Sequence, residues 1–404
     1  MLPVIKVELG FDETAPGNWF TLNDATKGLL DGAFTLAGGF YQDVSAYAMS
    51  LNIGRGKSRE LDRYQAGSVS IVFNNRNRYF DPTFASSPFY GQIVPRRNIK
   101  VSVDGVVQFT GIVDDWNLTF STNGEAVAVC NAYDNLSALS QQKLTADSYP
   151  EELSGARVNR VLDSAGVLYD PLARNIDAGQ TLLAAETVTA SDGVLNYLQQ
   201  VEVSEDGAFF IDKNAEATFF DVSRSPSSSS VVVLADDGSG IRYQSMNIVY
   251  GSELLYNFAT VTRNGGTAQT ATDADSIQTY GTRVVSEDSL HSTDEQALRL
   301  AQWLVAQYAQ PEFRFEAVDI SLNDASDAER VTLLGLEIGA KCQIKYTPVG
   351  VPPAISKYAQ IIGLEYKADP NAHVLTLRFK TLDYQLLILD DAVFGLLDSY
   401  YLGF

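Results

Sequence analysis

Residues 97–101 (RNIKV) followed by residues 109–113 (FTGIV) decide the expected fold, because a similar pair of segments returns late in the chain. There, residues 342–346 (CQIKY) precede residues 361–365 (IIGLE). A further alternating segment and an aspartate follow each pair, namely 126–130 with Asp134 and 374–379 with Asp383. Alternation of this kind is typical of β-strands, and its recurrence predicts two related β barrels. The alternative stays open that the match reflects only the alternation common to all sheet proteins.

The chain around these segments mixes helices and strands. Helical spacing of apolar residues around 158–165 and 194–201, next to short hairpin-like runs, indicates an α+β insertion. The clearest helix is expected at about 293–309, where Thr293 and Gln296 form a capping-box pattern.

The predicted fold class is mainly β with α+β insertions, and five parts are expected along the chain. They are an N-terminal arm with a docking element (1–44), a first barrel (45–135), an inserted α+β domain (136–245), a second barrel holding the 293–309 helix (246–385) and a C-terminal docking tail (386–404).

A second repeat links the two ends of the chain. Residues 22–32 (LNDATKGLLDG) and 389–399 (LDDAVFGLLDS) are identical at seven of eleven positions. One interpretation is a pair of similar helical turns; the other is a docking element offered to neighbouring proteins at each end. The docking interpretation makes eight residues candidate interface residues: Leu22, Asp24, Leu29, Leu30, Leu389, Asp391, Leu396 and Leu397.

Charge is spread unevenly along the chain. The net charge is −21, yet residues 51–100 hold nine basic side chains against three acidic ones. An acidic balance argues against a protein whose main task is to grip nucleic acid, because phosphate binding relies on Lys and Arg. The basic block is either a patch that docks on an acidic neighbour or a solvated face. Its candidate interface residues are Arg55, Arg59, Arg63, Arg76, Arg96 and Arg97.

Catalytic and cofactor motifs are not expected. Adjacent carboxylates such as Asp114-Asp115 point to opposite faces of a strand and cannot share one substrate. His291 and His373 are the only histidines, and neither HExxH nor GxSxG occurs. The two cysteines are expected to be buried free thiols. We therefore predict no enzyme activity, no cofactor and no metal site, and the short apolar runs predict no membrane span.

Several segments in fixed order resemble minor tail proteins, the tail hub or baseplate hub proteins of long-tailed bacteriophages. They include residues 54–67 (GRGKSRELDRYQAG), 73–82 (FNNRNRYFDP), 87–90 (SPFY), 109–111 (FTG), 160–166 (RVLDSAG), 194–221, 275–281 and 390–404. The resemblance covers residues 45–404, and its order and spacing are more specific than any one motif.

This resemblance implies two tail-hub-type β barrels with inserted α+β domains. It also implies a homotrimer with six barrels in a ring around the tail channel, placed at the tail tip of the virion after synthesis in the host bacterial cytoplasm. The implied partners are a distal tail protein or tail tube ring, a tape measure protein, and tail fibre or receptor-binding proteins, with transient passage of DNA.

Three functions follow from the sequence, in this order. The first is a structural hub that adapts a sixfold tail tube to a threefold tip, because three chains with two similar barrels present both symmetries. The second is a receptor-binding module for a host glycan or surface protein. The third is a cell-wall hydrolase, which would need a cleft with a carboxylate pair.

Overall fold

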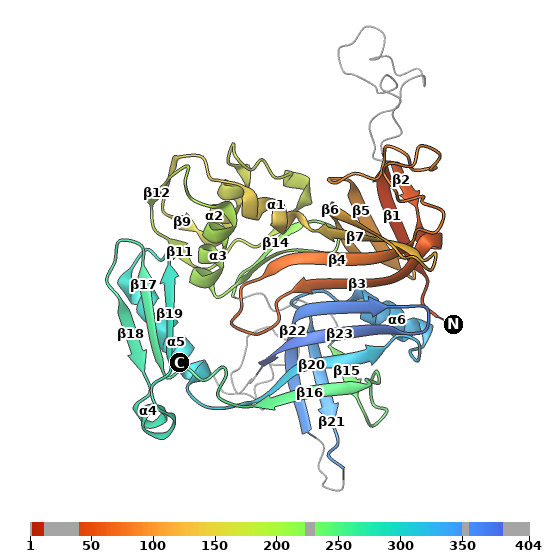
Figure 1. Ribbon diagram of the computed structural model, residues 1–404. Helices are drawn as coiled ribbons and strands as arrows, with labels where there is room; N and C mark the ends of the chain where they lie inside the picture. The colour runs from red at the N-terminus through yellow and green to blue at the C-terminus, as the bar shows by residue number, and fades with distance from the viewer. Residues whose placement is uncertain (1, 12–39, 223–230, 350–354, 383–404) are drawn as a thin grey trace.

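The computed structural model describes residues 2–11, 40–222, 231–349 and 355–382. Its centre is one 13-stranded sheet, beside which lie two smaller α+β parts (Figure 1). The terminal repeats at 22–32 and 389–399 lie outside the described residues, together with their eight candidate interface residues.

The sheet contains one five-strand arrangement twice. The first unit consists of β3 (Ala48–Gly56), β4 (Gln65–Asn74), β5 (Asn98–Val103), β6 (Val106–Phe120) and β7 (Ala126–Tyr133). The second unit consists of β16 (Ser245–Tyr250), β20 (Phe313–Ser321), β21 (Lys341–Tyr346), β22 (Ile355–Ala368) and β23 (His373–Leu382). The first is ordered β3-β4-β7-β6-β5 and the second β16-β20-β23-β22-β21. Both units therefore follow the same path through the sheet, and the internal repeat is present in the strand connectivity.

The repeat matches different residues from those matched by sequence. Both long strands carry a bulge, at Asp114 in β6 and at Ile362 in β22. Aligning the bulges places Asp115 in the position of Gly363, whereas the sequence match places Gly111 there. The two registers differ by four residues, but the bulge at Asp114 lies between them and reverses which side chains face inward. Val113 is buried before the bulge, whereas after it Asp115 is exposed and Trp116 packs against the core. The position of the bulge, seen in the strand pairing, therefore identifies the structural register of the two units.

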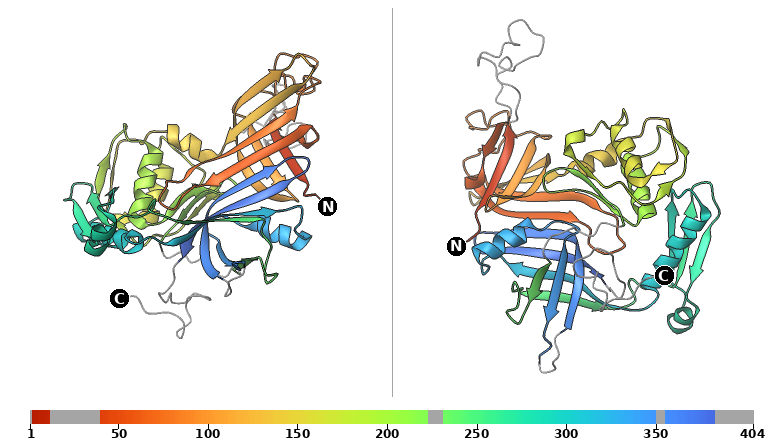
Figure 2. Two further views of the ribbon diagram at one scale, coloured as in Figure 1. Left: turned by 60° about the horizontal axis from the view of Figure 1, so that its bottom comes forward. Right: turned by 180° about the vertical axis from the view of Figure 1, so that it is seen from behind.

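The two units are joined edge to edge by an antiparallel ladder between β3 and β22, which we call the joint. The orange strands of the first unit and the blue strands of the second lie side by side at this joint in Figures 1 and 2. Among the described strands, no ladder closes either unit on itself. The described part of the chain thus forms one continuous curled sheet, in which β22 occupies the outer edge of the first unit, and the two closed barrels expected from the sequence are not confirmed.

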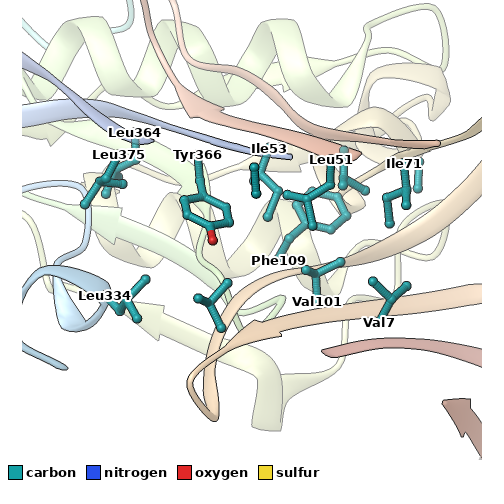
Figure 3. Packing of buried hydrophobic residues seen from close by; sticks show 14 of the residues in the cluster. Val7, Leu51, Ile53, Ile71, Val101, Phe109, Leu334, Leu364, Tyr366 and Leu375 are labelled. Atoms are coloured by element: carbon teal, nitrogen blue, oxygen red, sulfur yellow. The ribbon is translucent and has the colours of Figure 1, made fainter. Parts of the chain in front are cut away.

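A single buried cluster fills the concave side of this sheet and extends across both units. In Figure 3, Leu51 and Ile53 of β3 point toward Val101 and Phe109 of β5 and β6. Tyr366 of β22 lies beside them, so the core is continuous through the joint. Helix α6 (Asp327–Gly335) contributes to the same cluster from below.

Three further strands extend the units. β1 (Ile5–Phe11) pairs with β5, and β2 (Phe40–Asp43) pairs with β1. The segment expected as an N-terminal arm therefore contributes two strands to the sheet, with Val7 and Leu9 fully buried. β15 (Val232–Ala235) falls within the range expected as an inserted domain, but it pairs in parallel with β21 of the second unit.

The first insert, between β7 and β15, has its own hydrophobic core. Its helices are α1 (Asn135–Gln141), α2 (Ser154–Asp163) and α3 (Val194–Glu205). Its strands are β8 (Asp147–Tyr149), β9 (Glu152–Leu153), β10 (Arg174–Ile176), β11 (Leu182–Leu183), β12 (Glu186–Val188), β13 (Ala208–Ile211) and β14 (Ala217–Phe220). The 3-10 turn η2 (Pro171–Ala173) also belongs to this insert, whereas the 3-10 turn η1 (Ser45–Tyr47) lies between β2 and β3. The α+β character expected for this region is present.

The second insert lies between β16 and β20 and has a third core. It combines β17 (Phe258–Arg263), β18 (Gln269–Thr272) and β19 (Val284–Ser289) with α4 (Ala274–Tyr280) and α5 (Asp294–Tyr308). The capping box between Thr293 and Gln296 is formed at the start of α5. Only the helix was expected here; the structure adds a three-stranded sheet against which α5 packs. Within the described ranges, no helix is both long and apolar enough to cross a membrane.

Candidate assembly surfaces

The joint shows how two units of this fold bind each other. Six residue pairs connect β3 to β22, from Leu51 opposite Ala368 to Gly56 opposite Gly363. Leu51 and Ile53 are only 4% and 2% exposed. Backbone pairing and apolar side chains on one face therefore act together to hold the units.

Gly56 makes the closest approach at the joint. Its φ is +91°, a conformation that favours glycine, and an added Cβ would lie 2.3 Å from the carbonyl oxygen of Ile362. The amide of Lys57 then donates to that same oxygen at 2.9 Å. A side chain at position 56 would thus separate the two strands.

Arg55 is an internal residue of the joint. Its Nη1 donates to Glu337 Oε1 at 2.7 Å, and its side chain is 3% exposed. The ion pair links β3 to the segment after α6, so the Arg55 guanidinium is already bound by a carboxylate of the same chain. Arg55 is therefore not available as a docking residue on the surface of the chain.

A group of three charged residues, the buried Glu202 and the partly buried Lys57 and Asp206, lies where β3 ends against the first insert. Lys57 follows β3, and burial lowers its pKa. Burial raises the pKa of Glu202, near the end of α3, to about 7, and burial also raises that of Asp206. Glu202 Oε2 has no hydrogen-bond partner among the described residues. The neutral form of this carboxyl is therefore favoured by its surroundings.

The other basic candidates are spread over several surfaces. Arg59 pairs with Glu253 and Arg63 with Glu287, both at 2.5 Å, so these two connect the loop after β3 to the second insert. Arg76 is 3.7 Å from Glu125 and mostly exposed. Arg96 is exposed and Arg97 partly buried beside β5. The six arginines do not form one patch, and three of them make ion pairs between parts of the chain.

Besides the outer edge of β2 at the end of the sheet, two strand edges have no partner among the described strands. One is the outer edge of β16, whose inner edge pairs with β20. The other is the far end of β6 from Asp115 to Phe120, where the ladder with β5 has ended at Ile112. Phe120 and Tyr250 on these edges are 54% and 65% exposed. Neither edge was identified from the sequence. The clue was the short match between residues 50–53 (SLNI) and 245–248 (SMNI).

The aspartate and histidine residues considered for catalysis make contacts with other side chains of the chain. Asp115 Oδ1 accepts hydrogen bonds from the amides of Asn117 and Asn131. His373 is buried, with Nδ1 2.6 Å from the Tyr366 hydroxyl, and His291 is buried beside the Ser289 hydroxyl. Burial lowers the pKa of both histidines.

Cys130 and Cys342 are both buried and free, as expected, and burial raises the pKa of each thiol. Over the described ranges, no group of three or more His, Cys, Asp or Glu side chains could hold a metal ion.

The chain combines a duplicated sheet unit with open strand edges, and comparison with solved structures shows which proteins share this fold. A tail protein from Neisseria meningitidis aligns with 94% of this chain and 97% of its own, at 12% identity and a TM-score of 0.61. The 43 kDa tail protein of prophage MuSo2 from Shewanella oneidensis aligns over the same shares, at 12% identity and a TM-score of 0.58.

A third structure is a type VI secretion component of Escherichia coli, described as similar to the T4 bacteriophage tail proteins gp27 and gp5. It aligns over 83% of this chain and 74% of its own, at 11% identity and a TM-score of 0.51. No family model and no curated protein matches the sequence. The chain thus has the fold of phage tail proteins of the hub type, in agreement with the resemblance seen in its sequence.

Proposed function

We propose that this protein is a structural component of a bacteriophage tail, a hub that assembles into a ring around the tail channel at the tip. One observation carries the proposal: two copies of one sheet unit are joined edge to edge through β3 and β22, and the corresponding edges of the other unit are open. The outer edge of β16 corresponds to that of β3, and the far end of β6 corresponds to the joined part of β22. A chain built in this way can continue the same contact into the next chain. The fold shared with phage tail proteins supports the same function.

Three chains in a ring give six units in similar positions. A sixfold tail tube would then meet a near-sixfold surface, whereas a tip or fibre protein would meet a threefold one. The proposed neighbours are a distal tail protein or tube ring, a tape measure protein, and fibre or receptor-binding proteins, and DNA would pass through the ring. The protein would act in the virion by assembly, without catalysis.

The acidic balance of the chain fits a channel for DNA. A lumen lined by carboxylates would repel phosphate and so keep DNA from sticking during passage. A lumen found neutral or basic in the assembled ring would contradict this part of the proposal.

The ring itself is tested by the mass and shape of the purified protein. Light scattering after size exclusion should give about three times the 44.0 kDa of one chain, and negative-stain images should show rings with a central hole. A stable monomer that binds host glycans would overturn the hub in favour of a receptor-binding module. The docking role proposed for the C-terminal repeat is tested by deleting residues 390–404, because normal incorporation into virions would contradict it.

A further inference from the structure

The joint inside the chain is a guide to the contact between chains. In the first unit, Leu51 of β3 lies opposite Ile71 of β4, which lies opposite Cys130 of β7. In the second unit, Met246 of β16 lies opposite Val318 of β20, and that residue lies opposite Leu377 of β23. Residues 245–248 (SMNI) thus occupy the same place as residues 50–53 (SLNI), the strand that forms the joint.

The receiving side of the joint also has a counterpart. β22 accepts β3 along residues 363–368, the stretch that follows the bulge at Ile362. In the first unit the stretch after the bulge at Asp114 is residues 115–120 of β6. The first unit therefore has an open edge that corresponds to β22, namely residues 115–120 of β6. The second unit has an open edge that corresponds to β3, namely β16, and no described strand pairs with either edge.

We propose that β16 of one copy pairs antiparallel with the far end of β6 of the next copy. The register is that of the joint and places Met246 opposite Phe120, Ile248 opposite Leu118 and Tyr250 opposite Trp116. The inference rests on the proposed ring and adds the surface, the partner and the register that would form it. Each chain uses a different edge on each side, so the contact is head-to-tail, as a closed ring requires.

The side chains on the two edges complement each other. Trp116, Leu118 and Phe120 alternate with polar neighbours on β6, and they would meet three apolar residues of β16 on the same face. Leu118, Trp116, Met246 and Ile248 already pack against the core of their own chain, yet each is only partly buried. Leu51 and Ile53, which correspond to Met246 and Ile248 in the internal joint, are almost fully buried, as are Tyr366 and Leu364, which correspond to Leu118 and Trp116. A neighbouring strand is what the open edges lack.

The composition of the two open strands also favours pairing between them. Exposed edge strands are usually protected by lysine, proline or other charged residues, which discourage pairing. Residues 115–120 (DWNLTF) and 245–250 (SMNIVY) contain a single charged residue, Asp115, and no proline. Thr119 and Asn247 would face each other on the outer side, where both are exposed in the single chain. These edges therefore have the composition of strands that are paired.

Disulfide trapping tests the register directly. In the protein carrying Thr119→Cys and Asn247→Cys, mild oxidation should yield covalent dimers and trimers on a non-reducing gel. The matched control is Asn52→Cys with Lys367→Cys, because these residues are directly opposite in the joint and should form a disulfide within one chain. Thr119→Cys with Ser245→Cys, two residues out of register, should cross-link less. Cys130 and Cys342 are buried and should not interfere.

A charge substitution tests the same contact without cross-linking. Phe120→Lys should weaken self-association at least about tenfold by light scattering and leave the unfolding midpoint of the chain unchanged. Leu172→Lys, at a residue 92% exposed on the first insert, is the control and should assemble normally.

Two results would overturn the proposed pairing in different ways. Trimers that form without the Thr119 to Asn247 cross-link, while the internal control disulfide forms, would overturn the pairing and leave the ring intact. A chain that stays monomeric at all concentrations would overturn the ring as well.

Discussion

The joint strand β3 and the open strand β16 occupy the same position in the two units, yet they differ in what covers them. Leu51 and Ile53 are 4% and 2% exposed because β22 lies alongside them, whereas Met246 and Ile248 stay partly exposed. The sequences SLNI and SMNI are nearly the same. The difference shows that burial in this fold is decided by the neighbouring strand, and only secondarily by the strand itself.

The largest expected difference between the two positions concerns their isoleucines. Ile53→Ala should lower the free energy of unfolding by about 3 to 4 kcal/mol, because it leaves a cavity in the joint. Ile248→Ala should cost only about 1 kcal/mol in the monomer, because that side chain is partly solvated. Urea denaturation of monomeric fractions measures both. Equal losses would mean that the joint is no better packed than the open edge.

Glycine at the end of each strand gives the next comparison. Gly56→Ala should destabilise the chain by about 3 kcal/mol, because of the positive φ and the clash with Ile362. Gly251→Ala should change stability by less than about 0.5 kcal/mol, since its added Cβ would meet only Val249 at 3.8 Å. The same denaturation measurement applies, and a tolerated alanine at position 56 would argue against the tight approach of the two strands.

The buried ion pair of the joint should have a smaller effect. Glu337→Ala leaves the Arg55 guanidinium without its carboxylate partner, so a loss of about 2 kcal/mol is expected. The control is Glu295→Ala, which removes the exposed pair with Arg299 and should cost at most about 0.5 kcal/mol. Comparable losses for the two variants would show that Arg55 finds another partner when Glu337 is absent.

The charged group at the end of the joint predicts a pH dependence. Because the pKa of Glu202 is raised to about 7, the folded chain holds a proton there that the unfolded chain loses above about 4.5. Stability therefore falls as the pH rises from about 5 through 7. Glu202→Gln removes this destabilisation, so the stability of the variant relative to the wild type should rise by about 2 to 3 kcal/mol from pH 5 to pH 8.

Glu295→Gln serves as the control for this measurement, because it makes the same substitution at an exposed carboxyl outside this group. A stability difference between Glu202→Gln and the wild type that stays constant with pH would mean that Glu202 is ionised in the folded chain.

Parts of the fold that depend on local pattern were predictable. The strong alternation around β5, β6 and β7 and the capping box of α5 identify their elements from neighbouring residues alone. The sheet of the second insert was missed, since its strands have only four to six residues and several are largely exposed.

The candidate site was harder to predict, because it depends on partners distant in sequence. Arg55 was proposed for docking on the basis of its charge, but its partner Glu337 is 282 positions away. The open edges of β6 and β16 can be identified only when the strand order of the whole sheet is known. The sequence match between the two units is four residues out of register in β6, because the bulge at Asp114 that sets the structural register appears only in the strand pairing.

The sequence by itself determined that the chain is mainly β, contains a repeated unit and carries a strong negative charge, because these properties depend on composition and local periodicity. Only the tertiary structure decided that the repeats join through β3 and β22 and that one equivalent edge stays open on each side. Strand pairing is made by backbone groups that every residue carries, so the choice of neighbour depends on which surfaces meet in three dimensions.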